Sequence, residues 1–294
     1  MYYIKHVESQ GMRLLKQLFL HGKRLFNMQD ITEAANIEQI SSNQINNILS
    51  NLAKHKQVLR LRRGLYVAIE TRSEQLNIHS FAISSSLIQP SAISHWSALQ
   101  HHGLTEQIPQ IITATTPKKI ITPSMRKKQL IGSKLKHAWE IFGIRYEYIT
   151  VQENHFFGLE KIWLDEYSQV LITDRERTLL DAFIFSKMFG GMGAALGILE
   201  NALLNIDTRK LVRYTIQYNK KSLSKRLGWA LEYFGIPTEH YGPLLKVPIH
   251  YYCRLDPSVP SIGAYNKRWM IQNNLIKSEE NATITFKNSN RSSI

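Results

Sequence analysis

The sequence predicts a mixed α+β protein that begins with a winged helix-turn-helix. Three observations lead to this fold class. The first 70 residues read as three amphipathic helices followed by an alternating hairpin, the middle of the chain mixes helical and β-branched patterns, and the stretch from 193 to about 235 is helical in pattern. We expect a winged helix-turn-helix over residues 1–70, an α+β regulatory domain over 75–275 that ends in helices, and a polar tail over 276–294.

The first two helices are predicted from their apolar spacing and their ends. Apolar residues at positions 12, 14, 15, 18 and 19 line one face of a helix, which Gly22 ends. Asn27 is expected to cap a second, short helix, and Asp30 falls in its first turn, where the helix dipole favours an acid.

The third helix has the clearest start signal. Ser41 is followed three residues later by Gln44, the pattern of a capping box. Apolar positions 45, 48, 49 and 52 form an inward stripe, and the outward face carries amides and hydroxyls but no acid. Asn and Gln can pair bidentately with adenine in the major groove of DNA, where an acid would be repelled by phosphate. The residues expected to contact DNA from this helix are Ser41, Ser42, Asn43, Gln44, Asn46 and Asn47.

A basic hairpin follows this helix. Residues 58–62 alternate, Arg63 and Gly64 form a turn, and residues 65–67 return. Two helices, a capped polar helix and such a hairpin are the parts of a winged helix-turn-helix, in which the hairpin touches phosphate or the minor groove. The bases expected to make these contacts are Lys54, Lys56, Arg60, Arg62 and Arg63.

Charge is distributed unevenly along the chain. The 294 residues contain 37 Lys and Arg against 23 Asp and Glu, a net charge of +14. Residues 118–136 and 209–226 each hold seven bases and no acid, whereas residues 138–185 hold four bases and nine acids. Acid-free basic runs favour a polyanionic partner. The candidates for additional polyanion contacts are Lys118, Lys119, Arg126, Lys127, Lys128, Arg209, Lys210 and Arg213.

Other features restrict the compartment and the chemistry. The single cysteine, Cys253, excludes an internal disulfide framework and any multi-cysteine metal site, and it is expected to be a small core residue. The chain start lacks the apolar run of a signal peptide, and no stretch of about 20 apolar residues would span a membrane. We therefore expect a protein of the reducing cytoplasm without a membrane partner.

The middle of the chain is expected to alternate helices and strands. Helices are predicted over residues 76–87 and 94–103, and strands over 109–116, 144–151, 161–164 and 169–172. A further helix is expected to start at Thr173 or Asp174, with apolar positions 179, 180 and 183 facing inward. This region is therefore predicted to be α+β.

Three motifs in this order give the chain a family resemblance. They are Arg60-Leu-Arg-Arg-Gly-Leu-Tyr, Ser94-His-Trp-Ser-Ala-Leu-Gln-His-His-Gly-Leu-Thr and Ile172-Thr-Asp-Arg-Glu-Arg-Thr-Leu-Leu-Asp. With them the chain, to about residue 275, resembles the AbiEi family of antitoxins and transcriptional regulators from type IV toxin–antitoxin systems. The resemblance implies a bacterial or archaeal repressor of its own promoter. It also implies a nucleotidyltransferase-type toxin encoded beside it, which the antitoxin counters without forming a stable complex.

The sequence patterns argue against a metal site and against an enzyme. His95, His101 and His102 are six and seven residues apart, which does not suit two metal ligands on one helix face, and no metal or cofactor is expected. None of the 23 acids has Lys two positions later, as a restriction-type nuclease requires, and Asp174 and Glu176 suit a helix start. The expected protein is not an enzyme.

Two alternatives to a DNA-binding repressor stay open. The first is a protein- or RNA-binding interaction module that acts through residues 75–275. The second is a Mg²⁺-dependent nuclease, whose cleavage would be lost on changing Asp174 or Glu176.

Overall fold

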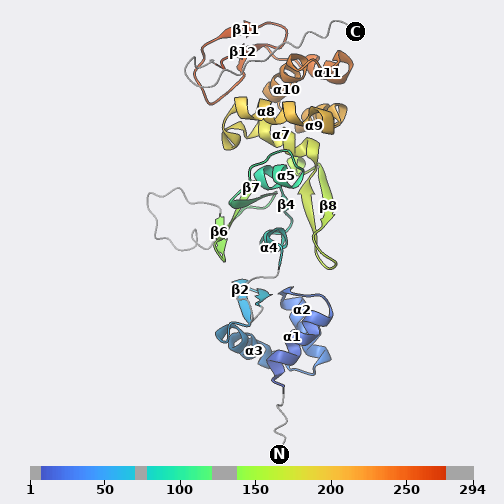
Figure 1. The fold of residues 1–294 in the computed structure, drawn as a ribbon, viewed down its shortest axis with the longest axis vertical. Coiled ribbons are helices and arrows are strands. Elements are labelled where there is room, and N and C mark those ends of the chain that lie inside the picture. The colour runs from blue at the N-terminus through green and yellow to red at the C-terminus, as the bar shows by residue number, and fades with distance from the viewer. Residues whose placement is uncertain (1–7, 70–77, 121–137, 276–294) are drawn as a thin grey trace, which may run out of the picture. The chain divides into compact units, whose positions relative to one another are not determined.

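The computed structural model describes residues 8–69, 78–120 and 138–275. It has mixed α+β structure, which confirms the predicted class, and the chain divides into two compact units between Leu179 and Leu180 (Figure 1). The predicted boundaries at residues 70–75 stay a prediction, and the predicted tail over 276–294 lies outside the described residues.

Residues 8–69 form three helices and a three-stranded sheet. In chain order the elements are α1 (Gln10–Leu20), β1 (Leu25–Asn27), α2 (Met28–Ile37), α3 (Ser42–Lys54), β2 (Val58–Arg62) and β3 (Leu65–Ala68). The strands pair antiparallel in the order β1-β3-β2. Apolar residues of all three helices are buried in one core, which they share with Phe26, Val58 and Tyr66. Of the predicted face of α1, Leu14, Leu15 and Leu18 are buried, but Met12 and Phe19 are 39% and 42% exposed.

Local hydrogen bonds define where α2 and α3 begin. Asn27 Oδ1 accepts from the backbone N–H groups of Gln29 and Asp30 at 2.7 and 3.1 Å, and the Asp30 carboxylate accepts from the Asn27 N–H at 2.8 Å. At α3, Gln44 Oε1 accepts from the Ser41 backbone N–H at 3.2 Å. Both predicted helix starts are therefore confirmed, and each satisfies backbone donors that a helix leaves unpaired.

The remainder of the first unit is built on a six-stranded mixed sheet in the order β6-β7-β5-β4-β9-β8. Its elements are α4 (Ser80–Leu87), β4 (Ala92–Ile93), α5 (His95–His101), β5 (Ile111–Thr116), β6 (Ala138–Ile141), β7 (Ile144–Thr150), η1 (Glu153–His155), β8 (Leu159–Trp163) and β9 (Gln169–Thr173). The pairs β5–β7 and β4–β9 are parallel, and the others are antiparallel. All four predicted strands are present, whereas β4 and β6 are additional.

The helix α7 (Arg175–Ile184) begins in the first unit and ends in the second. The Asp174 carboxylate accepts from the Arg177 backbone N–H at 2.8 Å, which confirms Asp174 as the cap. Leu179, Leu180 and Phe183 are buried, as their spacing predicts.

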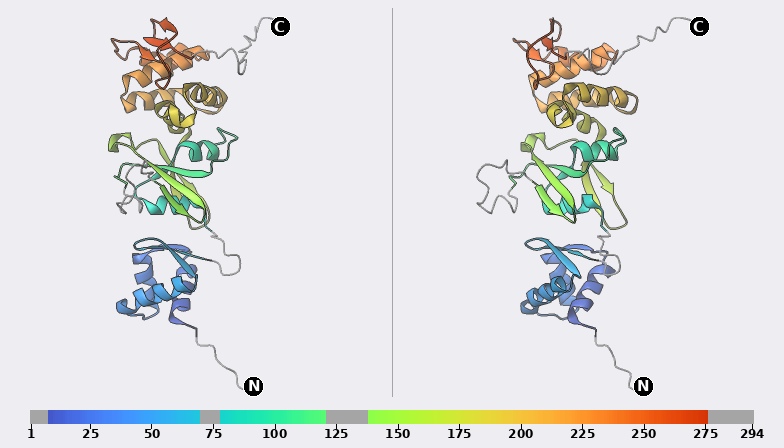
Figure 2. Two further views of the ribbon diagram at one scale, coloured as in Figure 1. Left: turned by 90° about the vertical axis from the view of Figure 1, so that its left-hand side faces the viewer. Right: turned by 60° about the vertical axis from the view of Figure 1, so that its left-hand side comes forward.

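The second unit combines helices with a small sheet. Its elements are η2 (Ser186–Phe189), α8 (Met192–Ala202), η3 (Leu203–Asn205), α9 (Thr208–Tyr218), α10 (Lys221–Tyr233), α11 (Thr238–Leu245), β10 (Cys253–Arg254), β11 (Ala264–Asn266) and β12 (Ile271–Asn273). Figure 2 shows these red strands beside the orange helices α10 and α11. The expectation that residues 75–275 end in helices is therefore wrong, because a sheet in the order β10-β12-β11 follows them. Strands of two or three residues are too short to show an alternating pattern.

In the described part of the chain, no helix has the length and apolar character needed to cross a bilayer. Cys253 is buried at the start of β10, as expected for a small core residue.

Candidate nucleic-acid interface

The polar face of α3 is exposed over its whole length. The side chains predicted to face DNA are all exposed: Ser41, Ser42, Asn43, Gln44, Asn46 and Asn47. The opposite face is buried, with Ile45, Ile48, Leu49 and Leu52 each at most 8% exposed. Burial of this apolar stripe orients the helix, so the amides face outward by necessity.

No acid lies on α3, and the nearest acid before it is already paired. The Glu38 carboxylate forms an ion pair with Arg13 at 3.7 Å and accepts from Gln17 Nε2 at 2.8 Å. Lys54 is exposed in the last turn of α3, and Lys56 is exposed in the turn that follows. The electrostatic character of this surface is therefore neutral to positive, which suits a phosphate backbone.

Two hydrogen bonds at the start of α3 limit what Gln44 can recognise. Its Oε1 accepts from both the backbone N–H and the hydroxyl of Ser41, at 3.2 and 3.0 Å. A side-chain amide oxygen has two lone pairs, so this oxygen is fully used within the helix start. Bidentate pairing with adenine needs the same oxygen, which leaves Asn43, Asn46 and Asn47 as the amides able to make it.

The hairpin of β2 and β3 presents its arginines to solvent but also packs against the six-stranded sheet. Arg60, Arg62 and Arg63 are exposed, as predicted. The Arg62 guanidinium donates to the backbone carbonyls of Ser86 and Arg63 at 3.2 and 3.4 Å. Half-buried leucines of β2, Leu59 and Leu61, and the buried Leu65 of β3 join the core beneath the sheet. The sequence does not reveal this second contact, since leucines on a short strand do not show which core they enter.

The candidates for additional contacts fall into three groups. Lys118 and Lys119 are exposed just after β5, whereas Arg126, Lys127 and Lys128 lie outside the described residues. On α9, Arg209 and Arg213 are exposed and Lys210 is half-buried beside the Tyr214 ring, 5.6 Å from its centroid. Arg213 also forms an ion pair with Asp207 at 3.6 Å.

Two bases of the second acid-free run are structural. Lys225 and Arg226 are only 3% and 8% exposed, which corrects the expectation that this whole run forms a polyanion surface. Lys225 Nζ donates to the backbone carbonyls of Leu244 and Leu245 at 3.3 and 2.9 Å, at the end of α11. Arg226 Nε donates to the Arg254 carbonyl at 2.9 Å. Burial lowers the pKa of both groups, and the carbonyls stabilise the buried charges.

The three histidines of the Ser94 motif do not form a ligand set. Within the described ranges, no group of three or more His, Cys, Asp or Glu side chains is placed to hold a metal ion. His102 Nε2 lies 2.7 Å from the Thr173 carbonyl, a polar contact with β9. His95 is fully buried, with Nδ1 2.7 Å from the Ser94 hydroxyl.

The acids considered for a nuclease lie at the start of α7. Asp174 and Glu176 are 7% and 6% exposed, and Asp174 caps the helix. Arg177 packs over the Phe157 ring at 4.7 Å and donates to the Phe157 carbonyl at 3.1 Å. Capping and burial thus account for a cluster that sequence alone could mistake for a catalytic one.

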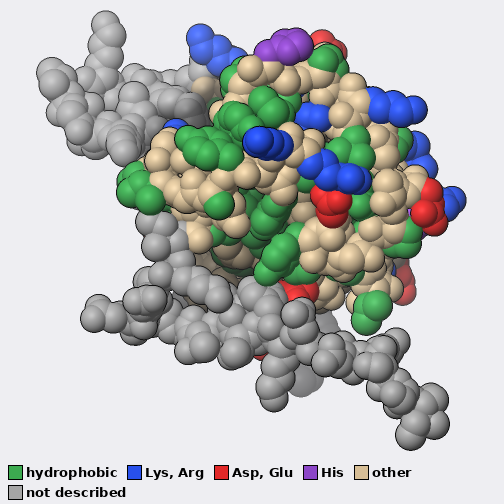
Figure 3. Space-filling model, turned by 90° about the horizontal axis from the view of Figure 1, so that it is seen from above, with side chains coloured by type: hydrophobic (Ala, Val, Ile, Leu, Met, Phe, Trp, Pro, Cys, Tyr) green, Lys and Arg blue, Asp and Glu red, His purple; other side chains and the backbone are tan. Residues whose placement is uncertain are grey.

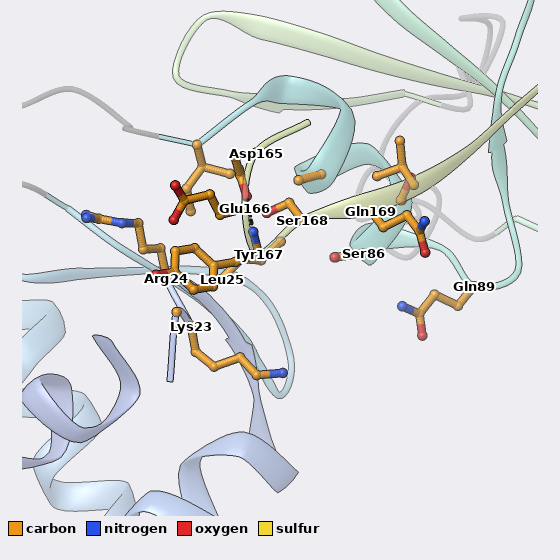
Figure 4. Close-up of a pocket in the computed structure, with 15 residues that line it drawn as sticks. Lys23, Arg24, Leu25, Ser86, Gln89, Asp165, Glu166, Tyr167, Ser168 and Gln169 are labelled. Atoms are coloured by element: carbon orange, nitrogen blue, oxygen red, sulfur yellow. Dashed lines mark hydrogen bonds between the residues drawn. The ribbon is translucent and has the colours of Figure 1, made fainter. Parts of the chain in front are cut away.

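A pocket of about 600 Å³ lies between β1 and the sheet-bearing part of the first unit (Figure 4). Lys23 and Arg24 line it, as do Asp165, Glu166 and Tyr167, and no His or Cys is among its described lining residues. The Asp165 carboxylate accepts from the Tyr167 backbone N–H at 2.8 Å. Charges of both signs make this pocket a poor match for a polyanion.

Comparisons with known proteins establish the fold alone. No family model and no curated protein sequence matches the chain. Its structure is similar to the crystal structure of the Rv2827c protein from Mycobacterium tuberculosis, with a TM-score of 0.60 and 12% sequence identity. The similarity covers 88% of this chain and 89% of that chain, so most of the architecture is shared between the two.

Proposed function

We propose that this chain is a sequence-specific transcriptional repressor that binds double-stranded DNA. Residues 8–69 act as a winged helix-turn-helix, and α3 enters the major groove. The observation that carries the proposal is the exposed, acid-free amide face of α3 opposite a fully buried apolar stripe. The order of α1, β1, α2, α3 and the hairpin supports it, because a winged helix-turn-helix has its elements in this order.

The exposed groups divide into base-reading and backbone-contacting sets. Asn43, Asn46 and Asn47 read base edges, while the N-terminal turn of α3, with Ser42, contacts phosphate. Arg60 and Arg63 contact phosphate or the minor groove from the hairpin. Arg62 has the same role, but its guanidinium also donates to the Ser86 carbonyl.

The resemblance to AbiEi antitoxins extends the proposal to the biological role. The chain represses its own promoter and serves as the antitoxin for a nucleotidyltransferase-type toxin, without a stable complex between the two. In this proposal its part in the pair is not catalytic, and Asp174 serves to cap α7. A nucleotidyltransferase-like reading frame next to the gene would support the pairing.

Binding to the chain's own upstream region tests the repressor. Fluorescence anisotropy measures the affinity of three variants for that duplex and for a scrambled duplex. We expect Asn46→Ala to cost about 1–3 kcal/mol on the cognate duplex only. Arg63→Ala should weaken binding to both duplexes and reduce the slope of log K against log salt concentration by about one. Asn36→Ala changes an exposed amide of α2 away from this face and serves as the control.

Two results would contradict the proposal. If Asn46→Ala and Arg63→Ala each lose the same affinity on both duplexes, α3 does not read sequence. If a chain lacking residues 1–70 keeps its biological activity, the interaction-module alternative through residues 75–275 is the better description.

A further inference from the structure

Four large side chains are exposed together in the second unit, around its small sheet. Tyr251, Tyr252, Ile262 and Tyr265 are 60%, 39%, 58% and 60% exposed, and we refer to them as the tyrosine patch. They flank or belong to strands of only two or three residues in the second unit, whereas α3 belongs to the first. Isolated exposed apolar residues are normal, but two exposed rings in contact, Tyr252 and Tyr265, with further exposed apolar side chains near them in the sequence, mark an interaction surface.

The strand register brings the patch together. Arg254 of β10 lies opposite Gln272 of β12, and Gln272 lies opposite Tyr265 of β11. Tyr252 is two residues before Arg254, and side chains two residues apart along a strand point to the same face. Tyr252 and Tyr265 therefore lie on one face of the sheet. Their ring centroids are 4.8 Å apart at an interplanar angle of 73°. The opposite face carries Cys253 and Ile271, which are buried.

The charges around the patch are basic. Lys246, Lys267 and Arg268 are exposed in residues 246–275. The single acid of that stretch, Asp256, is 3% exposed and accepts from the Met192 backbone N–H at 2.7 Å. Figure 3, the view of Figure 1 from above, shows hydrophobic, basic and acidic side chains on this face.

Glu232 of α10 brings one acid near this surface. Its carboxylate is 3.0 Å from Arg268 Nε and also accepts from Trp269 Nε1. It therefore balances Arg268. The exposed bases nearest to the tyrosines in the sequence are then Lys246, which precedes Tyr251, and Lys267, which follows Tyr265.

We propose that the tyrosine patch, with Lys246 and Lys267, binds single-stranded RNA by stacking unpaired bases on its rings. Aromatic side chains in a positive surface are the general means of binding single strands, because every base has a π-face and every linkage a phosphate. A duplex hides those faces, so this surface differs in ligand from α3. RNA is favoured over DNA because the exposed tyrosine hydroxyls can hydrogen-bond the 2′-hydroxyl.

Binding of a labelled adenine-rich RNA of about 12 nucleotides to the full chain tests this inference. The variant Tyr252→Ala/Tyr265→Ala should raise the Kd by about tenfold or more, since stacking on each ring is lost. Trp163→Ala, which removes an aromatic ring 68% exposed on β8, is the matched control and should leave the Kd unchanged. Lys246→Gln/Lys267→Gln should reduce the salt slope by about 1.4.

Two further variants distinguish RNA binding by the tyrosine patch from DNA binding. Tyr252→Phe/Tyr265→Phe keeps the rings, so RNA binding should persist while the preference over DNA of the same sequence falls. Asn46→Ala, which tests the repressor, should leave RNA binding intact, so each proposal can fail without the other. The inference is overturned if folded Tyr252→Ala/Tyr265→Ala, judged by its unfolding midpoint, binds RNA like the unchanged chain. It is also overturned if Trp163→Ala loses as much affinity.

Discussion

Gly228 must be glycine because the side chain of Trp269 packs against it. It lies inside α10, and a Cβ added there would be 2.1 Å from Trp269 Cζ3, far closer than atoms can approach. Trp269 is fully buried and donates from Nε1 to Glu232. Its ring therefore packs directly on the backbone of α10, and neither partner has room to move.

We expect Gly228→Ala to destabilise the chain by about 1–3 kcal/mol, because overpacking forces the Trp269 ring out of its position. Urea unfolding followed by tryptophan fluorescence measures the loss. Gly197→Ala is the matched control, since Gly197 is inside α8 and nothing lies within 4 Å of its added Cβ. That variant should gain about 0.5–1 kcal/mol from helix propensity. Equal effects of the two substitutions would refute the packing argument.

At the scale of elements, helix starts were predictable and short strands were not. The caps at Asn27, Ser41 and Asp174 depend on residues within three positions, so the sequence displays them directly. The strands β1 and β10–β12 have two or three residues, and pairing with distant strands creates them. Local pattern contains no information about such partners.

In the candidate interface, too, features that depend on nearby residues were predictable and tertiary contacts were not. The exposure of the α3 amides follows from the helical period of its apolar stripe, and the sequence therefore predicted it. The tertiary contacts escaped prediction: Arg62 donates to Ser86, and the leucines of β2 enter a second core. The tyrosine patch was missed for a related reason, because only the register of β10–β12 brings Tyr252 against Tyr265.

The cap of α4 makes this element sensitive to acid. His79 Nδ1 accepts from the Phe81 backbone N–H at 3.1 Å, a role that only the unprotonated nitrogen can fill. Burial lowers the pKa of His79 below its ordinary value of 6.5, against an opposing effect of Asp165. Protonation therefore favours the unfolded chain. The stabilisation is complete above pH 6.5 and is lost as the pH falls through the folded pKa.

We expect the Tm to fall between pH 7.5 and about pH 5, and His79→Asn to reduce that fall, because Asn caps a helix without titrating. Burial and then His102 lower the pKa of His101 too, so part of the dependence should persist in this variant. Differential scanning fluorimetry across this range measures it. His250→Asn, at an exposed histidine, is the control. A Tm that drops as steeply in His79→Asn as in the unchanged chain would contradict the capping role.

At the scale of the whole molecule, a net charge of +14 does not by itself define one binding surface. Part of the basic character is internal, since Lys225 and Arg226 are buried in the second unit and donate hydrogen bonds to backbone carbonyls there. Composition cannot distinguish such structural bases from exposed ones, because burial depends on tertiary packing. Exposed bases lie in both units, and those on α3, its hairpin and α9 are among them.

The salt dependence of DNA binding shows how many of these bases reach one duplex. Each neutralised phosphate contributes about −0.9 to the slope of log K against log salt, so Lys54, Lys56, Arg60, Arg62 and Arg63 together give about −4.5. We expect a steeper slope, because exposed bases on α9 add contacts. Arg209→Gln/Arg213→Gln should then bring the slope closer to zero by about 1.8.

A control of equal charge change separates contact from net charge. Lys161→Gln/Lys187→Gln also removes two exposed positive charges, but neither base lies in the acid-free runs. This variant should leave the slope nearly unchanged, because counterion release depends on phosphates contacted rather than on total charge. If both double variants change the slope equally, the second unit acts only through the overall field. If the unchanged chain itself gives a slope no steeper than about −4.5, the α9 bases do not touch DNA.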